Sequence, residues 1–155
     1  APTINREIRG YQTLKLQTLV NEIVKCCEDR KLYESQKFGV PYAELKCLML
    51  FNGERYLTAK GIAQNLDVAK SRVTKLINGL VGKGLVEAID DPKDARIRLI
   101  SLTPNGQKVS QEIDAFHQKI HGKILDQFEP VERKTVISNL ELLRSAMEVV
   151  KSQLA

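Results

Sequence analysis

The sequence predicts a mainly α-helical protein with one small β-hairpin, an α+β fold. Two observations carry this expectation: apolar residues recur at helical spacing along most of the chain, and one short region reads as a pair of strands around an acidic loop. The 155 residues, 43% of them hydrophobic, can bury one core but are too few for two domains of ordinary size. We therefore expect a single domain over residues 1–155.

Two helices open the predicted order. The first runs from Ile4 to about Leu32, and the face that carries its apolar stripe should be buried. Gly39 interrupts this pattern, and Pro41 suits the first turn of a second helix. The apolar residues of the two helices are Leu16, Leu19, Val20, Ile23, Val24 and Cys27, then Leu45, Leu48, Met49 and Leu50.

Four further helices and a hairpin follow. Thr58 can cap a short third helix, and a fourth spans about 69–83 before Gly84. Two strands are expected at Leu85–Ile89 and Arg96–Leu102 around the loop Asp90–Ala95. A Thr cap followed by Pro is a strong helix start, so Thr103-Pro104 begins a fifth helix, and Pro130 opens the sixth.

This order is that of a helix-turn-helix with a β-wing, a winged helix, expected over residues 41–102. Long helices, residues 1–34 and 103–155, flank it. The last helix carries the stripe Val136, Leu140, Leu143, Met147, Val150 and Leu154. One compact winged helix cannot cover this stripe and the amphipathic first helix as well, so residues 1–34 and 103–155 are expected to be dimerisation helices that meet a second copy of the chain in a homodimer.

The fourth helix predicts a nucleic-acid contact. At about 100° per residue, one side should face the core and the other should be polar, cationic and free of carboxylates. The expected core residues are Val73, Leu76, Ile77, Leu80 and Val81, and the polar side holds Ser71, Arg72, Thr74, Lys75, Asn78 and Gly82. Such a face fits the major groove of duplex DNA, although an ordinary solvated helix face is the alternative.

Charge and the hairpin point the same way. Between Ala59 and Gly84 five cations, Lys83 among them, stand against one acid, Asp67, which leaves a net +4 of the whole chain's +5. Such a cluster suits DNA phosphates. In the hairpin, Arg96 and Arg98 should share one side of a strand, with Asp94 orienting Arg96; an ordinary surface turn is the alternative. The predicted DNA-binding residues are Lys60, Lys70, Ser71, Arg72, Thr74, Lys75, Asn78, Asp94, Arg96 and Arg98.

The stretch from Leu57 to Gly106 resembles the winged-helix core of the MarR family of transcription regulators, most specifically in KGLV (83–86), DPKDAR (91–96) and SLTPNG (101–106). The resemblance implies a homodimer on a pseudo-palindromic operator, with repression relieved by a ligand or by oxidation, and an aromatic carboxylate or other small anion as the commonest effector. It also implies that Arg96 enters the minor groove and that Asp94 orients it. Three residues depart from the family pattern: Gly61, Ala69 and Ala95 stand where Glu, a capping Ser and a second wing Arg are frequent.

Three cysteines are candidate redox sites. Cys26, Cys27 and Cys47 lack the spacings of a disulfide framework, so thiols are expected. Because Cys27 falls on the apolar stripe, a packed and inert thiol is the more natural interpretation than a sensor. His117 and His121 are one helical turn apart, which could present two imidazoles to one metal, but a solvated pair is the alternative and no metal or cofactor is predicted.

Competing function classes find less support. An enzyme needs a nucleophile with its base, a phosphate-binding glycine loop or a ligand cluster, and none is visible, since Cys47 could meet a histidine only through the tertiary fold. Two alternatives stay open: a winged helix that docks proteins without binding specific DNA, and a thiol- or metal-responsive sensor of the same fold. With neither a leader nor an apolar span in the sequence, no membrane association and a cytoplasmic location are expected.

Overall fold

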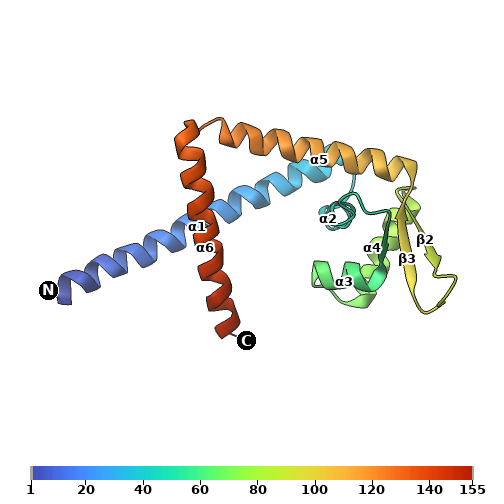
Figure 1. The fold of residues 1–155 in the computed structure, drawn as a ribbon, viewed down its shortest axis with the longest axis horizontal. Coiled ribbons are helices and arrows are strands. Elements are labelled where there is room, and N and C mark those ends of the chain that lie inside the picture. The colour runs from blue at the N-terminus through green and yellow to red at the C-terminus, as the bar shows by residue number, and fades with distance from the viewer. Residues whose placement is uncertain (1, 155) are drawn as a thin grey trace. The chain divides into compact units, whose positions relative to one another are not determined.

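The computed structural model describes residues 2–154, and its mainly helical architecture with a small antiparallel sheet confirms the predicted fold class (Figure 1). In chain order the elements are α1 (Pro2–Phe38), α2 (Tyr42–Met49), β1 (Tyr56–Thr58), α3 (Ala59–Leu66), α4 (Lys70–Gly82), β2 (Val86–Asp90), β3 (Arg98–Leu102), α5 (Pro104–Leu125) and α6 (Pro130–Gln153). No helix in the described part of the chain is long and apolar enough to cross a bilayer.

The chain forms two compact units, residues 1–111 and residues 112–155. The core of the first unit lies where α4 packs against α2, α3 and β2. Its fully buried side chains include Leu45, Leu48, Phe51, Ile62, Val73, Ile77, Leu80, Val86 and Ile100. Each large side chain contributes roughly 1.5–3 kcal/mol by leaving water, so this core fixes the position of α4.

The sheet has three strands in the order β1-β3-β2, all antiparallel. In the central strand β3, Ile100 stands opposite both Leu57 of β1 and Ala88 of β2. Strand β1 was not predicted, because three residues are too few to show a period-two pattern. It also placed the start of β3 too early: the Asp91 N–H donates to the Ile97 carbonyl at 2.8 Å and closes the hairpin there, so Arg96 lies in the loop.

Side-chain caps fix the joints around α4 and the hairpin. The Thr58 hydroxyl accepts a hydrogen bond from the Gly61 N–H at 3.0 Å, as its predicted capping role requires. Thr103 acts twice: its hydroxyl accepts from the Gly106 N–H at 3.0 Å and donates to the Gly84 carbonyl at 2.6 Å. Gly84 has a φ of +72°, a conformation open to glycine. The turn after α4 is therefore tied to the start of α5.

Helix α1 departs from expectation in length and in burial. It continues to Phe38, because the positive φ of Gly39, +69°, is the first backbone feature that ends it. Most of the expected buried stripe is exposed in the single chain: Val20 is half-buried, but Leu19 leaves 44% and Ile23 54% of its surface in contact with solvent. The physical reason is that α1 packs against α2, while much of its length extends away from the other elements of its unit (Figure 1).

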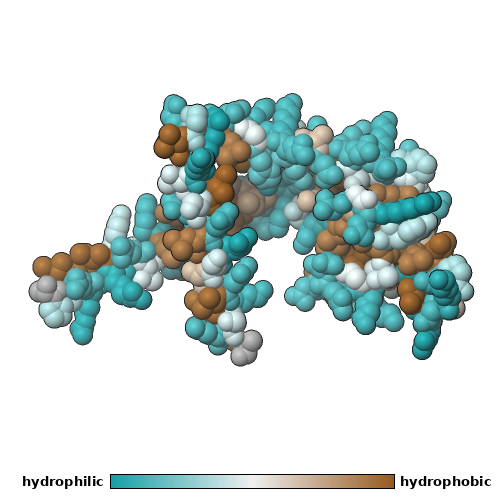
Figure 2. Space-filling view, in the orientation of Figure 1, coloured by the Kyte–Doolittle hydropathy of each residue, from teal (hydrophilic) through white to brown (hydrophobic). Residues whose placement is uncertain are grey.

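The second unit holds most of α5 and all of α6. Pro130 occupies the first turn of α6, and the Glu132 carboxylate accepts from the Glu129 N–H at 2.9 Å, which completes its start. The Arg133 guanidinium donates to the Leu125 carbonyl at 2.9 Å and so ties the two helices. No described residue of α6 is buried. Figure 2 shows apolar side chains at the surface along this helix.

Candidate nucleic-acid interface

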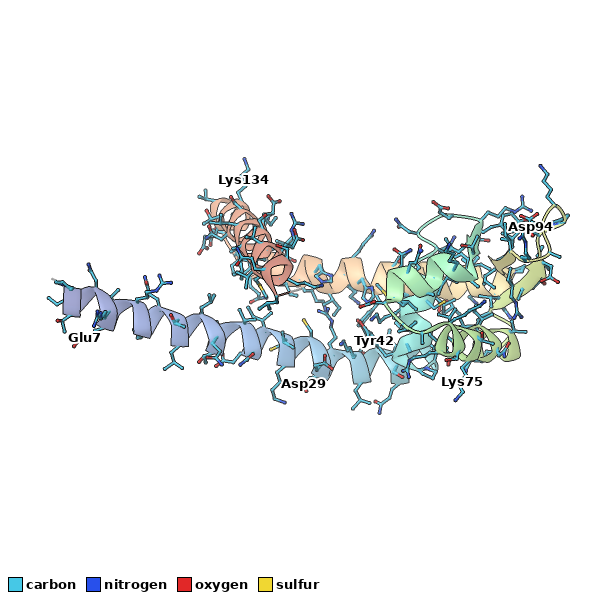
Figure 3. The ribbon with its side chains drawn as sticks, turned by 90° about the horizontal axis from the view of Figure 1, so that it is seen from below. Glu7, Asp29, Tyr42, Lys75, Asp94 and Lys134 are labelled. Atoms are coloured by element: carbon cyan, nitrogen blue, oxygen red, sulfur yellow. The ribbon has the colours of Figure 1, made fainter. Side chains whose placement is uncertain are left out.

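Helix α4 has the two faces that the sequence predicts. Val73, Ile77 and Leu80 are buried, and Leu76 is half-buried. The expected core position of Val81 is wrong: it is 42% exposed, because α4 ends one residue later and the chain turns away at Lys83. On the opposite face Ser71, Lys75 and Asn78 are exposed, and Lys75 points away from the body of its unit (Figure 3).

The start of α4 offers unoccupied hydrogen-bond donors. Ala69 is the N-cap residue and has no side chain to accept from the first turn, which contains Lys70, Ser71 and Arg72 but no acid. An uncapped helix start with cations beside it favours an anion. The Thr74 hydroxyl donates to the Lys70 carbonyl at 3.1 Å, so it can offer a ligand only its acceptor lone pairs.

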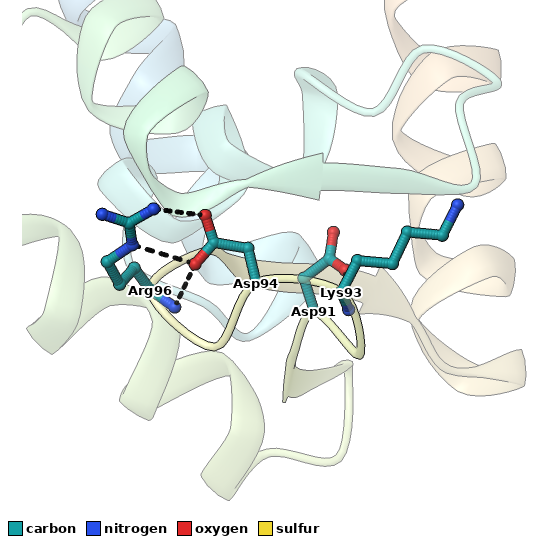
Figure 4. A network of polar contacts seen from close by, with 4 residues as sticks. All are labelled: Asp91, Lys93, Asp94 and Arg96. Atoms are coloured by element: carbon teal, nitrogen blue, oxygen red, sulfur yellow. Dashed lines mark hydrogen bonds and ion pairs between the residues drawn. The ribbon is translucent and has the colours of Figure 1, made fainter.

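In the wing, the loop of residues 91–97 between β2 and β3, a carboxylate holds a guanidinium. Arg96 Nε donates to Asp94 Oδ1 at 3.0 Å and Arg96 Nη2 to Asp94 Oδ2 at 3.1 Å, so the predicted contact between the two residues is confirmed (Figure 4). The Arg96 N–H also donates to Asp94 Oδ1 at 3.1 Å. These bonds, led by the guanidinium, lower the pKa of the Asp94 carboxyl. The Arg96 side chain is 90% exposed and thus free to meet a partner.

A groove of about 820 Å³ joins the wing to the starts of α3 and α4. Its lining includes Lys60 from α3, Lys70 and Thr74 from α4, and Arg96 and Arg98 from the hairpin. Half of the ten predicted DNA-binding residues therefore meet in one hollow. Asp90, also in the lining, is its one acid among the described residues.

Arg72 lies elsewhere, in a smaller hollow of about 180 Å³. There it joins Lys31 of α1 and Lys46 of α2, beside Tyr42. Neither lysine was predicted, because both lie far from α4 in the sequence and meet it through the packing of α1 and α2. Regular spacing could not have revealed them.

Lys83, counted above among the cations of this region, has a different partner. Its ammonium donates to both oxygens of Glu44 on α2, at 2.9 and 3.2 Å. The Glu44 side chain is only 7% exposed and lies against Gly79, where a Cβ would stand 3.0 Å from its Oε1. The charge of Lys83 is therefore offset inside the unit, and Lys60, Lys70, Arg72 and Lys75 remain to attract an anion.

The cysteines differ in their surroundings. Cys47 is fully buried, and desolvation, helped by the charge of Glu44, raises its thiol pKa to about 11. Cys26 and Cys27 are both exposed, so Cys27 is not packed within the single chain.

The two histidines of α5 lie next to each other along the helix. Their ring centroids are 6.4 Å apart, and His121 Nδ1 lies 2.7 Å from the His117 carbonyl oxygen. Among the described residues, no three His, Cys, Asp or Glu side chains come together as a metal would require.

Comparison with known proteins matches this geometry to a family. A model of the MarR family matches residues 38–97. The HTH-type transcriptional repressor MdtR of Bacillus subtilis strain 168 is 30% identical over 112 residues, which cover 72% of this chain and 70% of MdtR. The uncharacterized HTH-type transcriptional regulator YfiV of the same strain is 25% identical over 155 residues, covering 88% of this chain and 95% of YfiV.

A solved structure extends the likeness to the fold. Streptococcus pneumoniae FabT, crystallised in complex with DNA, has a TM-score of 0.76 at 19% identity and covers 86% of this chain and 98% of its own. Fold, family match and the likeness to MdtR agree, and the chain belongs to the MarR family of transcriptional regulators.

Proposed function

We propose that the protein is a sequence-specific regulator of transcription, acting in the cytoplasm, that binds double-stranded DNA as a homodimer. The observation that carries this proposal is the groove in which Lys60 and Lys70 meet Arg96 and Arg98. Cations from two helices and from the wing thus share one side of the first unit. A duplex carries two phosphate charges per ~3.4 Å, and displacing its counterions supplies affinity.

Helix α4 enters the major groove. The groove is about as wide as one α-helix, and residues near the helix N-terminus reach the base edges. Ser71, Lys75 and Asn78 stand on the exposed face in that position. We assign base reading to them, while Lys60 and Lys70 hold phosphates and fix the register of the helix.

The wing lies at the adjacent minor groove. Its narrow, negative channel attracts an arginine that is held in an extended direction. Arg96 satisfies this requirement, because Asp94 binds two of its guanidinium nitrogens and leaves the side chain 90% exposed. Arg98, at the start of β3, lines the same groove of the protein and contacts the neighbouring phosphate backbone of the DNA.

Two copies pair through their long helices. The stripes on α1 and α6 leave large apolar side chains in solvent, among them Ile23, Leu140 and Met147, each about half exposed. A second copy that covers these faces would set the recognition helices ~34–36 Å apart, the distance between neighbouring major grooves. A pseudo-palindromic operator follows from this twofold symmetry.

The regulator acts as a repressor that a small molecule or an oxidant releases. The relative MdtR is named a transcriptional repressor, which favours repression over activation. An anionic or aromatic effector in the groove would compete with DNA for Lys70 and Arg96, whose charges line it. Titrating a salicylate-like anion, zinc ions and a thiol oxidant separately against the bound complex tests each class of effector.

Affinity for random-sequence duplex at rising salt tests the proposal as a whole. A DNA-binding protein loses affinity linearly on a log–log plot, with a slope of about −0.9 for each phosphate it neutralises. A winged helix that only docks proteins binds the duplex feebly at every salt concentration, which would overturn the proposal. The variant Lys75→Ala then tests whether this residue reads a base. It should lower the discrimination between bases at one position by about 1–3 kcal/mol.

A further inference from the structure

Helix α4 has cations on both of its flanks. Lys70 and Thr74 line the large groove, whereas Arg72 and Leu76 line the small hollow. Arg72 lies about 200° around the helix from Lys70, and the exposed residues Ser71 and Lys75 fall between those directions. The outward face of α4 is therefore bordered on either side by a positively charged hollow.

We propose that the second hollow, formed by Lys31, Lys46 and Arg72, binds phosphates of the DNA strand opposite to the one held by Lys60 and Lys70. This inference rests on the proposed function and names a contact that it does not include. A helix in the major groove has one phosphate backbone on each side. Cations on a single flank would leave the second backbone without a partner.

The chemistry of the hollow suits a phosphate. Its described lining includes three cations and no carboxylate. Within residues 2–154, neither Lys46 nor Arg72 forms an ion pair, and both are exposed. Their charges are therefore available to a polyanion.

Lys31 is held in place by its neighbours. Its ammonium pairs with Glu28 at 2.7 Å and stands 5.1 Å from the centre of the Tyr42 ring. These contacts direct the lysine toward the hollow, although Glu28 offsets part of its charge. Lys46 consequently carries most of the added attraction together with Arg72, and Lys46 is the residue to test.

The first experiment compares salt slopes on a random-sequence duplex. Lys46→Gln should make the slope shallower by about 0.9, the loss of one phosphate contact, and Lys46→Arg should restore the wild-type slope. Lys134→Gln on α6 removes the same charge from an exposed position outside both hollows and should leave the slope unchanged. A wild-type slope for Lys46→Gln, or an equal loss with Lys134→Gln, would overturn the inference.

A second experiment assigns the strands. Ethylation interference is mapped on a duplex that the wild-type protein selects from a random pool. Lys46→Gln and Lys70→Gln should remove interference at phosphates that face each other across one major groove, on different strands. Loss of the same phosphates in both variants would overturn the inference alone. Absence of salt-dependent binding by the wild-type protein would instead overturn the proposed function.

Discussion

Glu44 on α2 and Lys83 at the end of α4 are joined across 39 residues of sequence, with the Lys83 ammonium 2.9 and 3.2 Å from the two carboxylate oxygens. The carboxylate lies beneath α4, where Gly79 leaves it room. This pair attaches the C-terminal end of α4 to α2, while the N-terminal end is the one that we propose to meet DNA. The position of the reading face thus depends on a buried charge.

Replacing Lys83 by Met should destabilise the protein, because the Glu44 carboxylate would stay buried without a partner. We expect a loss of about 2–3 kcal/mol in the free energy of unfolding, below the full range for buried pairs because Lys83 is 38% exposed. Urea unfolding measures it. The double variant Glu44→Met/Lys83→Met removes both charges and should recover much of the loss, whereas additive losses would show that the two residues do not interact.

Gly106 is required by close packing. A Cβ there would collide with the Leu85 carbonyl, which also accepts from the Thr103 N–H. Gly106→Ala should therefore cost about 1–3 kcal/mol of stability by pushing the start of α5 off the hairpin. Gly82→Ala is the matched control, since its Cβ meets no neighbouring atom and α4 gains a better helix former. Equal thermal midpoints for the two variants would contradict this prediction.

Much of the fold could be predicted because its signals are local. Thr58, Thr103 and Pro130 mark helix starts through their own chemistry, and each begins a helix in the structure. The periodicity of α4 placed Val73 and Ile77 correctly in the core for the same reason. The Asp94–Arg96 contact spans two residues and is equally local.

What failed depends on the tertiary structure. The pairing of Lys83 with Glu44 and the meeting of Lys31 with Arg72 need α1, α2 and α4 to be packed first. Apolar spacing marks a face to be covered but does not identify the chain that covers it, so the sequence could not show that most of the α1 stripe stays exposed within one copy. Cys27 is exposed together with that stripe.

Asp94 can be tested by the sign of its effect. Asp94→Asn removes a negative charge near DNA, which by charge alone would tighten binding, but it also loses the ionic bonds that orient Arg96. We expect weaker binding to duplex. Asp91→Asn in the same loop is the control, because among residues 2–154 the Asp91 carboxylate accepts only from the Lys93 N–H, at 2.8 Å. This variant should tighten binding slightly. Tighter binding by both variants would refute the orienting role.

The pH dependence of the Asp94–Arg96 pair follows from the direction in which the pKa of Asp94 is shifted. Because the folded pKa of Asp94 is lowered, the pair contributes fully above the ordinary value near 3.9 and is lost as pH falls through the folded pKa. NMR titration of the Asp94 carboxyl should give a midpoint below that value, and Arg96→Gln should move it back. An unshifted midpoint in the wild-type protein would show that the guanidinium does not hold the carboxylate.

Cys47 should resist thiol reagents in the folded protein. A Cys26→Ser/Cys27→Ser background leaves Cys47 as the thiol to be labelled. With a pKa of about 11, only about one Cys47 side chain in a thousand is a thiolate at pH 8. Its raised folded pKa stabilises the protein below the unfolded value, and that contribution is lost as pH rises from about 9 toward 11. Iodoacetamide labelling should follow global unfolding, and Cys47→Ala should remove this part of the alkaline decline. Rapid labelling of the native protein at pH 8 would contradict the prediction.

Two leucines on α6 test the homodimer. Leu140 falls on the stripe with Leu143 and Met147, whereas Leu142 lies about 160° from Leu140 around the helix. Both are exposed in the single chain, at 52% and 72%. Leu140→Asp would place a charge inside the paired faces and should dissociate the dimer, and Leu142→Asp should leave it intact. Sedimentation equilibrium measures the mass of each variant. Because specific binding needs two recognition helices in register, Leu140→Asp should also abolish selection of a palindromic duplex, and a stable Leu140→Asp dimer would place the interface elsewhere.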